Sequence, residues 1–152
     1  MLDLYDELSA LILRFERDAI PYALCGGMAM AVHGFVRATE DIDILVPPDA
    51  LDRALGAARA AGFDIENPPM KFAGGAVPMH RVCKAEPGAG DLLALDILIV
   101  TPATSAIWDS RFRAPWEHGT LAVLSSGGLI ALKSLRNSLQ DQADIARLRG
   151  EE

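Results

Sequence analysis

Apolar positions near the N-terminus recur at helical spacing. Asp3 stands in the position of an N-cap, and Asp6 and Glu7 follow in the first turn, where negative charge is favourable. The apolar residues are Leu4, Leu8, Leu11, Ile12 and Phe15. This pattern predicts an amphipathic helix over residues 3–18.

Short apolar segments bounded by glycine and proline predict alternating strands and helices in the first half of the chain. Gly26 and Gly27 interrupt one apolar segment and precede good helix formers, and Gly62 ends a later helical pattern. The predicted order is a strand at 22–25, a tight turn at Gly26 and Gly27, a helix at 28–32, a strand at 41–46, and a helix from Pro47 to residue 61.

The second half of the chain starts with extended segments and ends with helices. We expect residues 79–84 and 92–100 to pair as an antiparallel hairpin across residues 87–90, and residues 67–75 to form a loop. The other predicted elements are a strand at 63–66, a short helical stretch after Pro102, a strand at 121–124, and helices at 129–138 and 141–148.

Together these elements predict the α/β or α+β class, with a mixed β-sheet flanked by helices and C-terminal helices. The 152 residues, 51% of them apolar, suit a single domain over residues 1–152. No segment reaches the roughly 18 apolar residues of a membrane span, and the acidic start lacks a signal peptide. We therefore expect a cytoplasmic protein with no membrane partner.

Cys25 and Cys83 lack metal-ligand spacing, and we expect buried, reduced thiols.

Charge narrows the classes of function. The formal net charge of −7 disfavours general nucleic-acid binding, because it repels a phosphate backbone.

Asp41 and Asp43 alternate with isoleucine in a predicted strand, so both carboxylates lie on one face. Two adjacent negative charges are unfavourable unless a cation lies between them, and oxygen ligands suit Mg²⁺ or Mn²⁺. The alternative is a strand end with two solvated aspartates.

Asp96 is the single charged residue in the apolar segment 92–100, which predicts a strand buried on both faces. A buried carboxylate costs several kcal/mol unless it is paired, hydrogen-bonded or bound to metal. A metal shared with Asp41 and Asp43 would supply the partner, and the alternative is a buried arginine or backbone amides.

Gly26 and Gly27 between strand and helix would let a phosphate approach the backbone, although paired glycines often serve only turn geometry.

A family resemblance joins these features. The string Leu24-Cys25-Gly26-Gly27, followed after residues 28–40 by Asp41-Ile42-Asp43-Ile44, resembles the signature of the DNA polymerase beta superfamily of nucleotidyltransferases, with Asp96 as the third carboxylate. Residues 24–46 are most similar to bacterial nucleotidyltransferases of the antibiotic-modifying and abortive-infection toxin types. The string Leu129-Ile130-Ala131-Leu132-Lys133, followed by Arg136, Asp141 and Asp144, resembles their C-terminal helices.

The resemblance implies a nucleotidyltransferase fold and a metal-dependent transfer of a nucleoside monophosphate from a nucleoside triphosphate. It implies that Asp41, Asp43 and Asp96 are catalytic and bind Mg²⁺ or Mn²⁺. The residues it places at the nucleotide are Gly26, Gly27, Arg37, Thr39 and Lys133.

Other features of the chain leave the acceptor and the partners open. We expect a structural role for His33. The large acceptor-binding part of the antibiotic-modifying members is expected to be absent, so the acceptor could be a small molecule, a protein or tRNA. The protein could be the toxin half of a toxin–antitoxin pair, with an antitoxin partner. The rival interpretation is a non-catalytic nucleotide-binding or partner-binding module that retains the fold.

Overall fold

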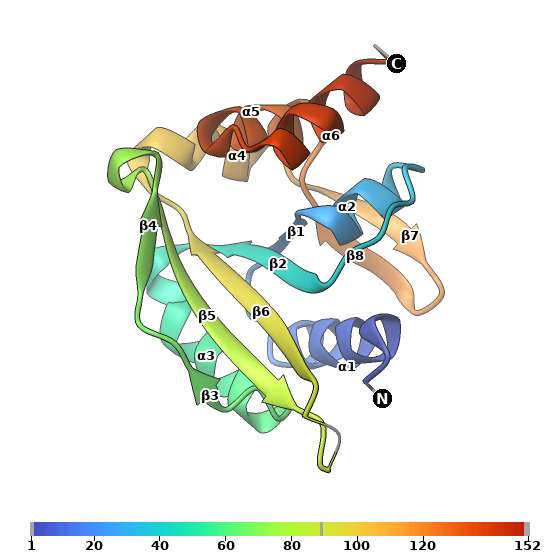
Figure 1. Cartoon of the computed structure of the whole chain (residues 1–152), viewed down its shortest axis with the longest axis vertical. Coiled ribbons are helices and arrows are strands. Elements are labelled where there is room, and N and C mark those ends of the chain that lie inside the picture. The colour runs from blue at the N-terminus through green and yellow to red at the C-terminus, as the bar shows by residue number, and fades with distance from the viewer. Residues whose placement is uncertain (1, 89, 151–152) are drawn as a thin grey trace.

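The computed structural model describes residues 2–88 and 90–150 as a mixed β-sheet with helices on both sides (Figure 1). Helices α1 (Leu4–Arg17) and α3 (Leu51–Ala60) lie on one side of the central strands. On the other side lie α4 (Ser105–Asp109), α5 (Ser126–Arg136) and α6 (Leu139–Arg149). The short helix α2 (Gly27–Val32) packs against the middle of the sheet.

The strand order in the sheet is β3-β5-β6-β2-β1-β8-β7, and β4 pairs with β5. The two central strands β2 and β6 run parallel, whereas β5 and β6 form an antiparallel hairpin. The strands are β1 (Ala23–Cys25), β2 (Asp41–Val46), β3 (Ile65–Glu66), β4 (Met70–Phe72), β5 (Val77–Ala85), β6 (Leu92–Ile99), β7 (Phe112–Trp116) and β8 (Gly119–Val123).

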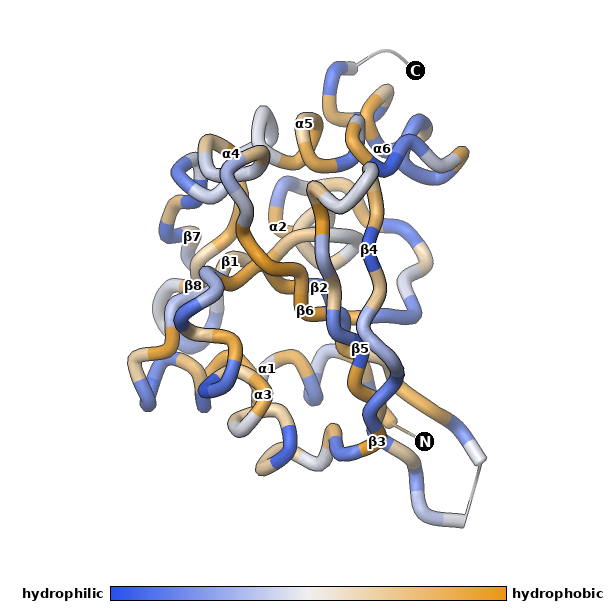
Figure 2. The backbone as a smooth tube through the Cα atoms, turned by 90° about the vertical axis from the view of Figure 1, so that its left-hand side faces the viewer, coloured by the Kyte–Doolittle hydropathy of each residue, from blue (hydrophilic) through white to orange (hydrophobic). Residues whose placement is uncertain are grey.

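The core lies around β1, β2 and β6, and the tube in Figure 2 is mostly orange, the colour of hydrophobic residues, along β1 and β6. Helix α1 covers these strands with Leu11, Ile12 and Phe15, each only 1% exposed. Strand β6 is buried on both faces over residues 95–98 and is nearly an unbroken apolar run, whereas β2 carries two aspartates beside its apolar residues. A charged side chain in these strands therefore needs a defined partner.

Most of the predicted elements are confirmed. Asp3 caps α1, because its side chain accepts a hydrogen bond from the backbone N–H of Asp6 at 2.9 Å. The predicted hairpin forms between β5 and β6, although residue 89 of its turn lies outside the described residues. Cys25 and Cys83 are free and buried, as expected.

Two strands contradict the sequence-based prediction. The predicted loop 67–75 contains β4, which pairs with β5 because Gly74 and Gly75 adopt positive φ and allow a tight reversal. Strand β7 was missed because it carries Pro115 and the charged Arg113. As the edge strand of the sheet, β7 can accommodate a residue that cannot donate to a neighbour.

The C-terminal helices begin earlier than predicted. Helix α5 starts at Ser126 because the Ser125 side chain accepts a hydrogen bond from Gly128 N–H at 3.0 Å. Helix α6 starts at Leu139, behind a capping box of Ser138 and Asp141. Within the described ranges, no helix has the length and apolar character needed to cross a membrane.

Candidate functional site

The three predicted carboxylates come together on the two parallel central strands. Asp43 of β2 is in register with Asp96 of β6, and Asp41 precedes Asp43 by two residues on the same face. All three line one cleft of about 210 Å³. The same cleft is lined by every residue that the resemblance places at the nucleotide: Gly26, Gly27, Arg37, Thr39 and Lys133.

Asp96 has an arginine as its partner. Arg81 of β5 is the cross-strand neighbour of Asp96 and donates from Nε and one terminal nitrogen to its two carboxylate oxygens, at 2.7 and 2.9 Å. Arg81 also lies 3.6 Å from a carboxylate oxygen of Asp41. The hydrogen bond to Asp96 raises the pKa of Arg81. The arginine alternative is thus present in the structure, and a metal shared by the three carboxylates stays a prediction.

Asp43 is the least compensated of the three carboxylates. In the described part of the chain, its side chain has no hydrogen bond and no ion pair. Burial, followed by the negative charge of Asp96, raises the pKa of Asp43 to about 7. The pKa of Asp41 is also raised, first by burial and then by the charge of Asp96. This end of the cleft therefore carries more negative charge than the protein neutralises.

Gly26 and Gly27 keep the floor of the cleft open. Gly26 has a φ of 79°, and a Cβ there would lie 2.2 Å from Oδ2 of Asp43. A Cβ at Gly27 would lie 2.3 Å from Oγ1 of Thr39. Both distances are shorter than any real contact, so only glycine allows the backbone to pass this close to the side chains of Asp43 and Thr39.

Asp144 organises the opposite wall of the cleft. Its fully buried carboxylate accepts hydrogen bonds from Arg37 Nε, Arg37 NH2, Lys133 Nζ and Gln140 Nε2, each at 2.9 Å. Burial raises the pKa of Asp144, but the hydrogen bonds from Arg37 and Lys133 outweigh it, so the pKa lies below its ordinary value. Asp144 therefore fixes the positions of both predicted nucleotide-binding cations.

Two further cations line the cleft: Arg81, which sequence reasoning missed, and Arg136, which belongs to the resembling C-terminal string but was given no role. A signal existed for Arg81, because Arg81 and Asp96 lie equally far from the middle of the predicted turn 87–90 and a symmetric hairpin would pair them. The signal for Arg136 was its place three residues after Lys133 in the resembling string, on the same side of α5. His33 has a structural contact, in which Nε2 lies 2.8 Å from the carbonyl oxygen of Leu124.

The carboxylates of the cleft are the candidate ligands of a metal ion. Across residues 2–88 and 90–150, no three carboxylate, imidazole or thiolate side chains are arranged to hold one metal ion as they stand. Asp41 and Asp43 nevertheless fit a divalent cation, because both are oxygen donors, crowded together and with raised pKa values. Asp96 would have to share its carboxylate between such a cation and Arg81.

Comparison by sequence gives no match, either with a known family model or with a curated protein. Comparison by structure does give matches. A protein of Thermotoga maritima, described as a candidate nucleotidyltransferase, superposes with a TM-score of 0.63 at 12% identity, covering 97% of this chain and 93% of that one. JHP933 from Helicobacter pylori has a TM-score of 0.58 at 19% identity, covering 96% of this chain and 64% of that one.

The antibiotic-resistance factor ANT(2'')-Ia also matches, and its structure was determined with adenylyl-2''-tobramycin. The TM-score is 0.56 at 13% identity, and the match covers 94% of this chain and 95% of that one. ANT(2'')-Ia thus agrees with this chain in fold over nearly its whole length. The agreement in architecture over almost the whole chain shows that this protein has the nucleotidyltransferase fold.

Proposed function

We propose that this cleft transfers a nucleoside monophosphate from a nucleoside triphosphate to an acceptor hydroxyl or phosphate. The observation that carries the proposal is the meeting of Asp41, Asp43 and Asp96 in one cleft beside Gly26 and Gly27. The nucleotidyltransferase fold of the chain supports it. The acceptor oxygen would bond to the α-phosphorus while the bond to the departing pyrophosphate breaks.

The residues of the cleft divide into two groups for this chemistry. Asp41 and Asp43 would hold Mg²⁺ or Mn²⁺, and such an ion neutralises charge on the phosphates when it is bound. On the opposite wall, Lys133 and Arg37 are held by Asp144, so they offer their remaining N–H groups in fixed positions. Arg136 has no carboxylate partner in the described ranges and is the cation most available to a phosphate.

A non-catalytic nucleotide-binding module is the second candidate, favoured by one observation. Arg81 already neutralises Asp96 through two hydrogen bonds, so this carboxylate has a counter-charge without a metal ion. In this alternative, the cleft binds a triphosphate and releases it unchanged. If the protein is instead an enzyme with a tRNA or protein acceptor, modification of that acceptor would suit the toxin of a toxin–antitoxin pair.

The two candidates differ in turnover. The full chain is incubated with Mg²⁺ or Mn²⁺, each of the four ribonucleoside triphosphates labelled at the α-phosphate, and bacterial small-molecule, protein or tRNA fractions. Label in one fraction, with an equal amount of pyrophosphate, is the expected result, and Asp43→Asn should abolish it. The matched control is Asp64→Asn, which removes an exposed carboxylate outside the cleft. Triphosphate binding without label in any fraction would establish the module instead.

A further inference from the structure

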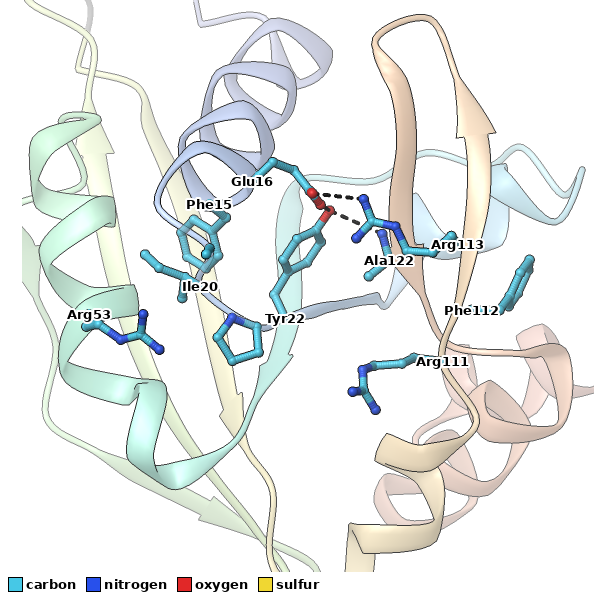
Figure 3. Close-up of a pocket in the computed structure, with 11 residues that line it drawn as sticks. Phe15, Glu16, Ile20, Tyr22, Arg53, Arg111, Phe112, Arg113 and Ala122 are labelled. Atoms are coloured by element: carbon cyan, nitrogen blue, oxygen red, sulfur yellow. Dashed lines mark hydrogen bonds and ion pairs between the residues drawn. The ribbon is translucent and has the colours of Figure 1, made fainter.

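A second, larger cavity lies away from the cleft. It is a groove of about 750 Å³ between α1, α3 and the β7–β8 hairpin (Figure 3). No residue lines both sites. Tyr22 lies in the groove and Gly26 in the cleft, so the two sites are roughly 13 Å apart along β1, from the rise per residue of a strand.

Arginines reach this groove from both of its walls. Arg53 extends from α3 and Arg111 from the segment before β7, and their guanidinium groups point toward the groove from opposite sides (Figure 3). Arg53 has no hydrogen bond or ion pair within residues 2–88 and 90–150. Arg111 stacks on the Trp108 ring at 3.9 Å and donates to the Trp108 carbonyl, but within the same ranges it has no carboxylate partner. Two uncompensated arginines facing one groove are unexpected in a chain with a net charge of −7.

A third arginine, Arg113, pairs with a carboxylate in the wall of the groove. Arg113 donates to Glu16 at 2.8 Å, and the Tyr22 hydroxyl donates to the other oxygen of Glu16 at 2.6 Å. The same hydroxyl accepts a hydrogen bond from Ala122 N–H at 3.1 Å. Burial raises the pKa of Glu16, but its hydrogen bonds to Arg113 and Tyr22 outweigh burial, so the pKa lies below its ordinary value. Glu16 is thereby engaged with Arg113 and does not neutralise Arg53 or Arg111.

The floor of the groove is apolar. Phe15 and Ile20 are buried beneath it, and the rings of Pro21 and Tyr22 complete it. The volume falls within the range of about 300–1,000 Å³ that is typical of sites for small molecules. Guanidinium groups bind phosphate and carboxylate groups through paired N–H donors. We propose that this groove binds a small organic anion, a compound that joins a phosphate or carboxylate group to an apolar body.

The test is an NMR titration of the ¹⁵N-labelled full chain in EDTA, with phenyl phosphate, phenylacetate and inorganic phosphate as probes. Shifts should centre on Arg53, Arg111 and Ala122, and the tighter of the two aromatic probes identifies the acidic group. That probe should bind about tenfold more tightly than inorganic phosphate, because its ring leaves water. Shifts confined to Gly26 and Gly27, or inorganic phosphate binding as tightly as both aromatic probes, would overturn the proposal.

Substitutions locate the site independently. Arg53→Gln and Arg111→Gln should each weaken the better aromatic probe about tenfold, through loss of a charge-assisted hydrogen bond. The matched control is Arg59→Gln on the same helix as Arg53, since Arg59 is exposed, outside the groove and paired with Glu66 at 3.5 Å. It should change the affinity less than twofold. An equal loss in all three variants would show attraction by net charge alone, and no loss in any would place binding elsewhere.

Discussion

Asp43→Asn in the metal-free protein tests whether the cleft is built around uncompensated negative charge. The folded protein holds the pKa of Asp43 at about 7, against an ordinary value of 3.8. Between these two values the folded state binds more protons at this residue than the unfolded state, so stability falls as the pH rises. Asparagine removes this cost, because it keeps the shape of aspartate without its charge.

The size of the effect follows from the difference in pKa. About three pKa units correspond to about 4 kcal/mol at 1.36 kcal/mol per unit, which applies above pH 7. Because the Asp43 side chain keeps some contact with water, the expected gain in the free energy of unfolding is about 2 kcal/mol. For a chain of this length, that gain raises the melting temperature by about 6 °C. The gain shrinks steadily as the pH falls and is nearly absent near pH 4.

The assay is thermal unfolding of wild type and variant at pH 8 and pH 4.5 in EDTA. The variant should be more stable at pH 8, with a much smaller difference at pH 4.5. Asp64→Asn is the control for the change in net charge, because Asp64 is exposed and outside the cleft. Destabilisation of Asp43→Asn at pH 8, or a gain of the same size at both pH values, would refute the reasoning.

Two further substitutions test the walls of the cleft. Asp144→Asn should lower stability by about 3 kcal/mol in chemical denaturation at pH 7, because Lys133 and Arg37 lose their buried counter-charge. The folded protein lowers the pKa of Asp144, so this contribution is present above pH 4 and declines as the pH falls further. A difference that does not shrink at all below pH 4 would contradict the assignment. Gly27→Ala should destabilise by about 1–3 kcal/mol, through the clash of its Cβ with Thr39. Added Thr39→Ala should recover part of that loss in a double-mutant cycle, and strictly additive losses would exclude the clash.

The elements that the sequence predicted well have a local cause. Helix α1 has a cap and an apolar stripe, and β6 has an unbroken apolar run with Asp96 inside it. Strand β7 has no such pattern, because an edge strand with Pro115 is defined by its partner rather than by its own residues. Likewise, β4 depends on a turn that brings it back to β5.

The site was predicted as far as it depends on short strings of residues. Asp41 and Asp43 share a face through alternation, and Gly26 precedes a helix in sequence, so both features were visible. The pairing of Arg81 with Asp96 depends on hairpin register, and the role of Asp144 depends on the packing of α6 against α5. The arginine-lined groove is assembled from segments far apart in the chain, so no short string of residues predicts it.

A crystal structure of the full chain with Mg²⁺ and a triphosphate analogue that resists cleavage at the α-phosphate tests the central claim most directly. The account predicts a metal ion bonded to carboxylate oxygens of Asp41 and Asp43, with the phosphates between Gly26 and Arg136. A triphosphate bound outside this cleft, or one bound inside it with no metal at Asp41 and Asp43, would contradict the account.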